Sequence, residues 1–212
     1  MDTNKKEILI IAIITSFLLG LTLGLLFNIE PSKANHVRLS YESEEIGQHL
    51  HVNTHIRSVV LKHEMIQNEI EYWHLENPSK KRVRKKATFI YGYAKKYNID
   101  PFLLTALGIV ESNLTQNRVS HRGAVGISQI MPRIAQYLEV NPYDMEENIK
   151  GGAKFLNELE NQYNSTELAL AHYNAGVNPE RKLGWSSVAS YVWNIQNITD
   201  ELQRRYINGL GK

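Results

Sequence analysis

The chain has 212 residues, of which 42% are hydrophobic and 22% charged, and its net charge of +2 comes from 24 basic and 22 acidic side chains. This length fits one domain, or one domain with an appendage, and the composition excludes a chain that is disordered throughout. The near-balance of charge argues against a general nucleic-acid binder, whose domain is normally strongly basic. Because there is no cysteine, disulfides, thiolate metal sites and cysteine nucleophiles are excluded.

An apolar segment without any charged residue occupies residues 8–27. A helix of this length spans about 30 Å, the thickness of the hydrocarbon core of a bilayer. We therefore expect residues 1–30 to be a retained membrane anchor. The alternative is a secretory signal with a small-residue cleavage site at residues 32–34. The flanking charges do not decide the orientation, because basic residues lie on both sides of the segment.

Residues 31–82 show no catalytic constellation, and we expect them to form a helical stalk or linker. Mostly apolar side chains from Val52 to Trp73 recur at alternating spacings of four and three, which is a heptad-like stripe. Such a stripe is typical of a self-associating stalk or of an amphipathic helix packed on the next domain, and its short length favours the second. The basic run at residues 80–86 is interpreted as a solvated helix face or a linker.

Residues 83–198 are predicted to form a mainly helical domain, followed by a tail at 199–212. The pattern predicts two helices in succession, the second of them from Phe102 to about Ser112. Asp100 is suited to cap this second helix, and Pro101 is suited to its first turn. Because the segment is apolar nearly all round, we expect it to be a buried central helix.

A single carboxylate, Glu111, lies at the end of this apolar helix. A buried carboxylate is costly for a purely structural role, although a glutamate can also surface where a helix emerges from the core. If the side chain is buried, desolvation raises its pKa, which is what a general acid near neutral pH requires. The sequence therefore predicts Glu111 as a catalytic acid.

Three polar motifs and a tyrosine follow Glu111. The segment 120–132 contains two glycines three residues apart, which allow a tight turn, and Gln129, whose amide can bind a sugar or orient a carboxyl group. A helix is expected to open at Asn148, and another to end at Gly176 as its C-cap. Tyr191 is expected to open the final helical segment.

Together these residues resemble the catalytic domain of Slt-type lytic transglycosylases, within the lysozyme-like superfamily. The resemblance covers residues 83–198. It rests on four motifs in the family's order, which are Glu111-Ser112, the block Ser120–Pro132, the helix Asn148–Leu156 and Tyr173-Asn174-Ala175-Gly176. Each motif alone is common, but four in order are specific. The expected fold is therefore mainly α, with a lysozyme-like transglycosylase domain preceded by a transmembrane helix and a helical stalk.

The resemblance also implies site residues. Glu111 corresponds to the family's catalytic acid and base. The residues that correspond to the lining of the glycan groove are Ser120, Gln129, Tyr173, Asn174 and Tyr191. For the two tyrosines, core packing with a hydrogen-bonded hydroxyl is an equal alternative, and Asn174 can instead bond its own backbone.

The sequence departs from the family pattern at a few positions. Ser128 stands where the family usually has methionine, and Ile127 where it has leucine. Ile134 replaces a usual threonine, and His172 a common alanine. We expect the loss of a methionine from the groove to alter glycan affinity while leaving the acid in place.

The motifs supply one carboxylate, whereas most glycoside hydrolases use two. The nearest acids in the sequence, Asp100 and Glu139, lie outside the motifs. In the family, the glutamate protonates the glycosidic oxygen between N-acetylmuramic acid (MurNAc) and N-acetylglucosamine (GlcNAc). It then acts as a base on the muramyl 6-hydroxyl, and 1,6-anhydro-MurNAc forms without water.

The resemblance thus implies a lyase that cleaves peptidoglycan strands for local wall opening in secretion, conjugation or phage entry. Two alternatives stay open, a muramidase that uses the same Glu111 and a non-catalytic glycan-binding scaffold of a membrane-spanning machine. We expect no cofactor, no metal and no nucleic-acid partner. The expected partners are glycan strands, the bilayer through residues 8–27 and components of such a machine. The domain is expected on the cell-wall side of a bacterial or virion membrane.

Overall fold

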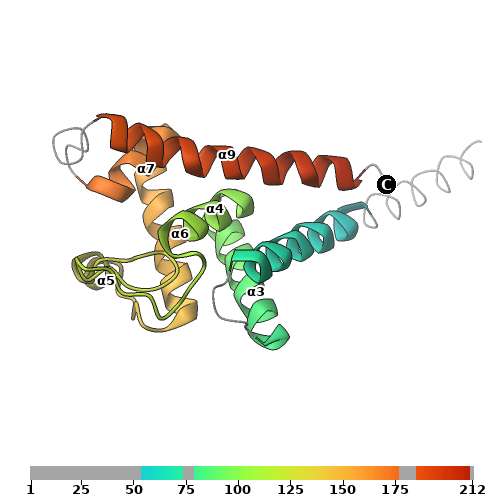
Figure 1. Cartoon of the computed structure of the whole chain (residues 1–212), viewed down its shortest axis with the longest axis horizontal. Helices are drawn as coiled ribbons and strands as arrows, with labels where there is room; N and C mark the ends of the chain where they lie inside the picture. Colours follow the sequence, from blue (N-terminus) through green and yellow to red (C-terminus); the bar gives the residue numbers. More distant parts are fainter. Residues whose placement is uncertain (1–53, 74–78, 177–184, 211–212) are drawn as a thin grey trace, which may run out of the picture. The chain divides into compact units, whose positions relative to one another are not determined.

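The computed structural model describes residues 54–73, 79–176 and 185–210. These residues are mainly helical, as predicted (Figure 1). After a helical segment at residues 54–73, the helices are α3 (Lys80–Lys96), α4 (Pro101–Ser112), α5 (Pro132–Leu138), α6 (Met145–Tyr163), α7 (Thr166–Ala175) and α9 (Trp185–Leu210). Residues from Ser58 onward form one compact unit, to which the helices α3 to α9 belong.

Helix α4 is the buried central helix that the sequence predicted. It begins where the Asp100 side chain accepts a hydrogen bond from the backbone N–H of Phe102 at 2.8 Å, with Pro101 in the first turn. Ten of its 12 residues are buried, and it packs against α3 and α9. It ends at Asn113, which adopts a left-handed conformation.

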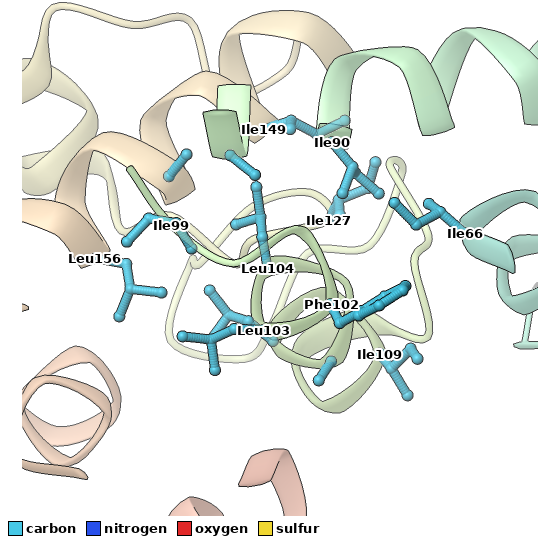
Figure 2. Packing of buried hydrophobic residues seen from close by; sticks show 14 of the residues in the cluster. Ile66, Ile90, Ile99, Phe102, Leu103, Leu104, Ile109, Ile127, Ile149 and Leu156 are labelled. Atoms are coloured by element: carbon cyan, nitrogen blue, oxygen red, sulfur yellow. The ribbon is translucent and has the colours of Figure 1, made fainter. Parts of the chain in front are cut away.

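The hydrophobic core surrounds α4 and includes side chains from α3, α6 and the loop residue Ile127 (Figure 2). Leu107, Ile90 and Leu156 are at most 1% exposed. Burying a side chain of this size contributes about 1.5–3 kcal/mol. The core therefore fixes the last turn of α4, where Glu111 lies, relative to the other helices.

Residues 58–73 of the first described helix pack on this core. Ile66 and Ile70 are fully buried in the core cluster. Glu69, only 7% exposed, forms an ion pair with Arg205 on α9 at 2.7 Å. These contacts agree with the interpretation of the apolar stripe as an amphipathic helix, because its apolar face is used within the chain.

The compact unit extends beyond the range of the family motifs on both sides. Its first residue is Ser58, which the sequence placed in the stalk, and α9 continues to Leu210, through the expected tail. Leu202 is 1% exposed and belongs to the core cluster. The family motifs end earlier because they contain the residues of the site, whereas the hydrophobic core also needs apolar side chains outside the motifs.

Two helix starts also differ from expectation. Helix α6 begins at Met145, not at Asn148, because the Asp144 side chain caps it through the N–H of Glu147 at 3.0 Å. Helix α9 begins at Trp185, so Tyr191 lies inside it and does not open it.

The basic run forms the first turns of α3. Most of its side chains are exposed, as expected for a solvated helix face. Lys86 differs, because it is 1% exposed and its Nζ donates a hydrogen bond to the carbonyl of Leu114.

Within residues 54–73, 79–176 and 185–210, no helix has the length and apolar character that crossing a bilayer requires. The predicted anchor at residues 8–27 lies outside the described residues, as does the stalk from 31 to 53.

Candidate active site

Glu111 is the last but one residue of α4, and the next residue fastens this helix end to a loop. The Ser112 hydroxyl donates to the carbonyl of Ile127 at 2.8 Å and accepts from the N–H of Thr115 at 3.1 Å. Ser112 is fully buried, so its bond to Ile127 is shielded from water. The position of the Glu111 carboxyl group is thereby coupled to the loop that carries the Ser120–Pro132 motif.

Burial raises the pKa of Glu111 from 4.5 to about 7, since removing a carboxylate from water disfavours its charged form. A hydrogen bond from Tyr191 and the positive charge of Arg118 act in the opposite direction and lower the pKa. Near neutral pH, Glu111 therefore has access to both its protonated and its ionised form. A group with such a pKa can donate a proton and later take one up.

Two tyrosines from different helices meet at this carboxyl group. The Tyr191 hydroxyl, from α9, donates to Glu111 Oε1 at 2.6 Å. The Tyr173 hydroxyl, from α7, donates to the carbonyl of Ser128 at 2.8 Å. Burial and the charge of Glu111 raise the pKa of both tyrosines well above its ordinary value, so both hydroxyls keep their protons. The fold thus brings together Glu111, Tyr173 and Tyr191, which are far apart in the sequence.

The buried side chain of Asn148 holds the loop that faces these groups. Its Oδ1 accepts from the N–H of Ser128 at 2.8 Å, and its Nδ2 donates to the carbonyls of Val125 and Pro142 at 2.8 and 2.9 Å. Gly126 has φ +82°, and a Cβ at this position would overlap the Asn148 amide. The second glycine of the motif is therefore required both by backbone conformation and by close contact with α6.

The remaining predicted site residues bond the backbone of the loop or are exposed to solvent. Gln129 donates through Nε2 to the carbonyls of Gly126 and Arg118, at 2.9 and 3.2 Å, so its Oε1 is the atom left for a ligand. The Ser120 hydroxyl accepts from the N–H of Ala124 at 3.0 Å and so closes the turn. Asn174 follows Tyr173 on α7 and has an exposed side chain.

A family model described as "Transglycosylase SLT domain" matches residues 88–190, the range that contains Glu111, the loop and Tyr173. Residues 88–190 match the transglycosylase SLT domain family, and we call this part of the chain the SLT domain. The resemblance drawn from the four motifs is thereby confirmed.

Named relatives match parts of the chain. A protein named "Transglycosylase" of Enterobacteria phage PRD1 is 39% identical over 84 residues, which cover 39% of this chain and 32% of that protein. A "Membrane-bound lytic murein transglycosylase F" of Marinobacter nauticus is 32% identical over 111 residues, which cover 49% of this chain and 21% of that protein. The chain thus spans a third or less of the length of these relatives.

Solved structures support the fold of the SLT domain. The lytic transglycosylase Slt of Pseudomonas aeruginosa, as an inactive glutamate-to-glutamine mutant, has a TM-score of 0.50 at 20% identity and covers 56% of this chain and 24% of its own. The 70 kDa soluble lytic transglycosylase of Escherichia coli has a TM-score of 0.50 at 21% identity and covers 69% and 30%. The part of the chain that these structures cover therefore has an Slt-like fold.

The position where the family has methionine was expected to line the glycan groove. Ser128 at this position does not lie open to solvent. It is 2% exposed, and a Cβ at Gly152 on α6 would overlap its side chain. Its N–H and carbonyl are bound by Asn148 and Tyr173. A small residue at 128 therefore matches tight packing against α6, and its main role in the SLT domain is to connect the loop to both helices.

Two residues at the site were not among the sequence candidates. Asn148 was noted only as the start of a helix motif, and a buried asparagine before a glycine pair was the available signal. Arg118 acts on Glu111 through its charge, and nothing in its sequence surroundings indicated this. Among the described residues, no group of three or more acidic or histidine side chains is arranged to hold a metal ion.

The raised pKa makes the stability of the SLT domain dependent on pH. The folded state keeps the Glu111 proton between pH 4.5 and about 7, where an unfolded chain has lost it, so stability falls as pH rises through this window. A Glu111→Gln variant has no charge to bury, so we expect it to be about 3 kcal/mol more stable than the wild type at pH 8 and equally stable at pH 4. Denaturant unfolding at both pH values measures this. A gain at pH 8 that persists at pH 4, or that the exposed Glu139→Gln control reproduces, would contradict the prediction.

Proposed function

We propose that this chain is a lytic transglycosylase that cleaves the β-1,4 bond between MurNAc and GlcNAc in peptidoglycan and forms 1,6-anhydro-MurNAc. The observation that carries the proposal is the placement of Glu111 at the end of α4 with the Tyr191 hydroxyl on one of its oxygens, where burial raises its pKa and allows one residue to serve as both acid and base. The names of the relatives, which include lytic murein transglycosylases, support the same substrate class.

The chemistry is complete with one carboxyl group. Protonated Glu111 donates its proton to the glycosidic oxygen, and the bond between this oxygen and the muramyl C1 breaks. The muramyl 6-hydroxyl then attacks C1, and its proton passes to the Glu111 carboxylate. A C–O bond is broken and another is formed, the acid is regenerated, and no water or redox partner is consumed.

The surroundings of Glu111 favour this single-acid route over hydrolysis with two carboxylates. Asp100 lies at the opposite end of α4, about 16 Å away along the helix, and its two oxygens are bound by Phe102 N and Gln203 Nε2. Among the described residues, no other carboxylate contributes to the pKa of Glu111. A muramidase would need a second group to activate water.

We assign the other groups by the atoms that they leave available. Tyr191 holds one oxygen of Glu111 and directs the proton-bearing oxygen toward the glycan. Gln129 presents Oε1 as an acceptor for a sugar hydroxyl or an N-acetyl N–H, since both Nε2 protons are used. Asn174, the residue after Tyr173, offers an exposed amide, and Ser120 shapes the turn of the loop.

A Tyr191→Phe variant tests the role of Tyr191. The hydroxyl lowers the pKa of Glu111, so its removal should raise this pKa and move the alkaline limb of the pH–activity profile to higher pH. Tyr173→Phe is the matched control, because its hydroxyl bonds a backbone carbonyl instead of Glu111, and its alkaline limb should stay in place. A limb that moves to lower pH in Tyr191→Phe, or moves equally in both variants, would contradict the assignment.

Digestion of purified sacculi by the full chain tests the proposed function. We expect released muropeptides with anhydro-muramyl ends, one water lighter than reducing ends by mass spectrometry, and none from Glu111→Gln. Reducing ends that depend on Glu111 would establish the muramidase alternative instead. Sacculus binding without release by the folded protein would establish the scaffold.

For its location, we propose a membrane-tethered enzyme with the SLT domain on the cell-wall side. The apolar segment 8–27 and the membrane-bound relatives support the tether, and the phage relative is compatible with local wall opening. Protease added to intact spheroplasts should digest the SLT domain of the full chain. Protection that ends only after lysis would contradict this orientation.

A further inference from the structure

A cavity of about 210 Å³ lies among the start of α3, the residues that follow α4 and the start of α6. Its lining includes Arg82, Lys86, Gln116, Asn117 and Tyr143, none of which belongs to the site around Glu111. A water molecule occupies about 30 Å³ in the liquid, so the cavity has room for a small organic ligand. No acidic side chain is among the described residues that line it, which argues against a cation.

The amide of Gln116 provides an unsatisfied hydrogen-bond acceptor at this cavity. Its Nε2 donates to the carbonyl of Pro142 at 3.1 Å, while its Oε1 is buried and has no donor in the described part of the chain. The Pro142 carbonyl accepts hydrogen bonds only, so it fixes which end of the amide is the acceptor. A buried acceptor without a partner costs about 1–3 kcal/mol, so this atom favours a ligand with an N–H group.

Turning the Gln116 amide toward the cavity leaves the Pro142 carbonyl paired and costs only the bond that Nε2 makes to it. The Pro142 carbonyl also accepts from Asn148 Nδ2 at 2.9 Å, and this bond remains when the Gln116 amide rotates. A ligand N–H on the Gln116 Oε1 therefore has to offset the loss of the one hydrogen bond from Nε2.

Two cationic side chains line the same cavity. Lys86 is buried, and its Nζ is held by the Leu114 carbonyl, so its charge has a fixed place in the wall. Arg82 is exposed, and its guanidinium forms no ion pair with any residue that the structure describes. A guanidinium of this kind can bind a carboxylate through two parallel hydrogen bonds.

We propose that this cavity binds the carboxylate of an N-acylated amino acid, with the carboxylate on Arg82 and the adjacent amide N–H on Gln116 Oε1. A bare phosphate would satisfy the guanidinium but would give Gln116 no N–H. The source that we assign is the free C-terminus of a peptidoglycan stem peptide. This source rests on the proposed function, whereas the ligand chemistry does not.

Ligand-detected NMR with the full chain tests the site, using N-acetyl-D-alanine as the probe. We expect binding to be at least about tenfold weaker for N-acetyl-D-alaninamide, which lacks the carboxylate, and for propionate, which lacks the N–H. Free D-alanine should also bind more weakly, because its ammonium group lies where the acyl N–H is expected. Inorganic phosphate that binds as tightly as the probe would overturn the proposed ligand. Free D-alanine that binds as tightly as the probe would overturn the proposed peptide source.

Matched variants locate the binding. Arg82→Gln should weaken binding of N-acetyl-D-alanine at least about tenfold, and Gln116→Leu should remove the preference over propionate. Arg84→Gln is the control on the same helix, because Arg84 is exposed and does not line the cavity, and it should bind within about twofold of the wild type. The proposal would be overturned if no probe binds saturably, because the cavity would then hold water only. An equal loss of binding in Arg84→Gln would also overturn it.

The two proposals fail independently. Glu111→Gln should keep the affinity for N-acetyl-D-alanine while it loses glycan cleavage. If the chain does not cleave glycan but the probe binds as described, the ligand chemistry stands and only the stem-peptide source is overturned.

Discussion

A Glu111→Gln variant is expected to cleave peptidoglycan at least about a thousandfold more slowly than the wild type. General acid–base catalysis contributes about 10²–10⁴ in rate, and here the same residue acts in both proton transfers. Glutamine keeps the size of the side chain and can still accept the 2.6 Å hydrogen bond from Tyr191, so the site geometry should be preserved. Initial rates of muropeptide release from sacculi provide the measurement.

Two comparisons show whether the loss of activity is specific to Glu111. The Glu139→Gln variant removes an exposed carboxylate outside the site and should keep the wild-type rate. The pH 8 stability of Glu111→Gln shows whether the variant is folded. A Glu111→Gln protein that is folded and retains more than about a tenth of the wild-type rate would exclude Glu111 as the acid.

An Asn148→Ala variant is expected to lose about 4 kcal/mol of stability, or about 10 °C in Tm. The substitution leaves the N–H of Ser128 and the carbonyl of Val125 without their partner in a buried environment, at about 1–3 kcal/mol each, and also creates a cavity. For a domain of this size, each kcal/mol corresponds to about 2–4 °C. Thermal unfolding of the full chain followed by circular dichroism measures the change.

The matched control for Asn148→Ala is Asn161→Ala on the same helix. Asn161 is exposed, and its amide bonds Asn157 at the surface, so its removal should change stability by less than about 0.5 kcal/mol. Because Asn148 holds the loop that carries Gln129, the folded Asn148→Ala protein should also cleave glycan more slowly. Equal stability losses in the two variants would mean that α6 is sensitive as a whole and that Asn148 has no special role.

The parts of the site that lie within one helix were predictable from the sequence. Asp100, Pro101 and the apolar run after them determine where α4 begins and that it is buried, because capping and burial depend on neighbouring residues. The side chain of Glu111, at the end of this run, is only partly exposed, which agrees with the hypothesis of a shielded acid. The helical nature of residues 54–73 was equally visible as a periodic apolar stripe.

The parts that depend on contacts between distant segments were not predictable. The direction of the Ser128 side chain is set by α6, which lies about 20 residues further along the chain. The charge of Arg118 reaches Glu111 only because the loop folds back on the end of α4. The extent of the compact unit likewise depends on Leu202 and Ile66, which carry no motif.

The site carries a cost in stability that its chemistry requires. A carboxyl group with a pKa near neutral must be shielded from water, and its charged form then destabilises the folded state. Substitutions that make Glu111 neutral are expected to stabilise the SLT domain and to inactivate it. Such opposing effects are typical of residues that are retained for function.

The most direct test of this account is a titration of Glu111 itself. In the full chain labelled with ¹³C at the glutamate carboxyl carbons, the signal absent from Glu111→Gln identifies the residue. We predict a midpoint at about pH 7, caused by burial of the carboxyl group. A midpoint at or below the ordinary value of 4.5 would mean that Glu111 is ionised at neutral pH and unable to act as the acid.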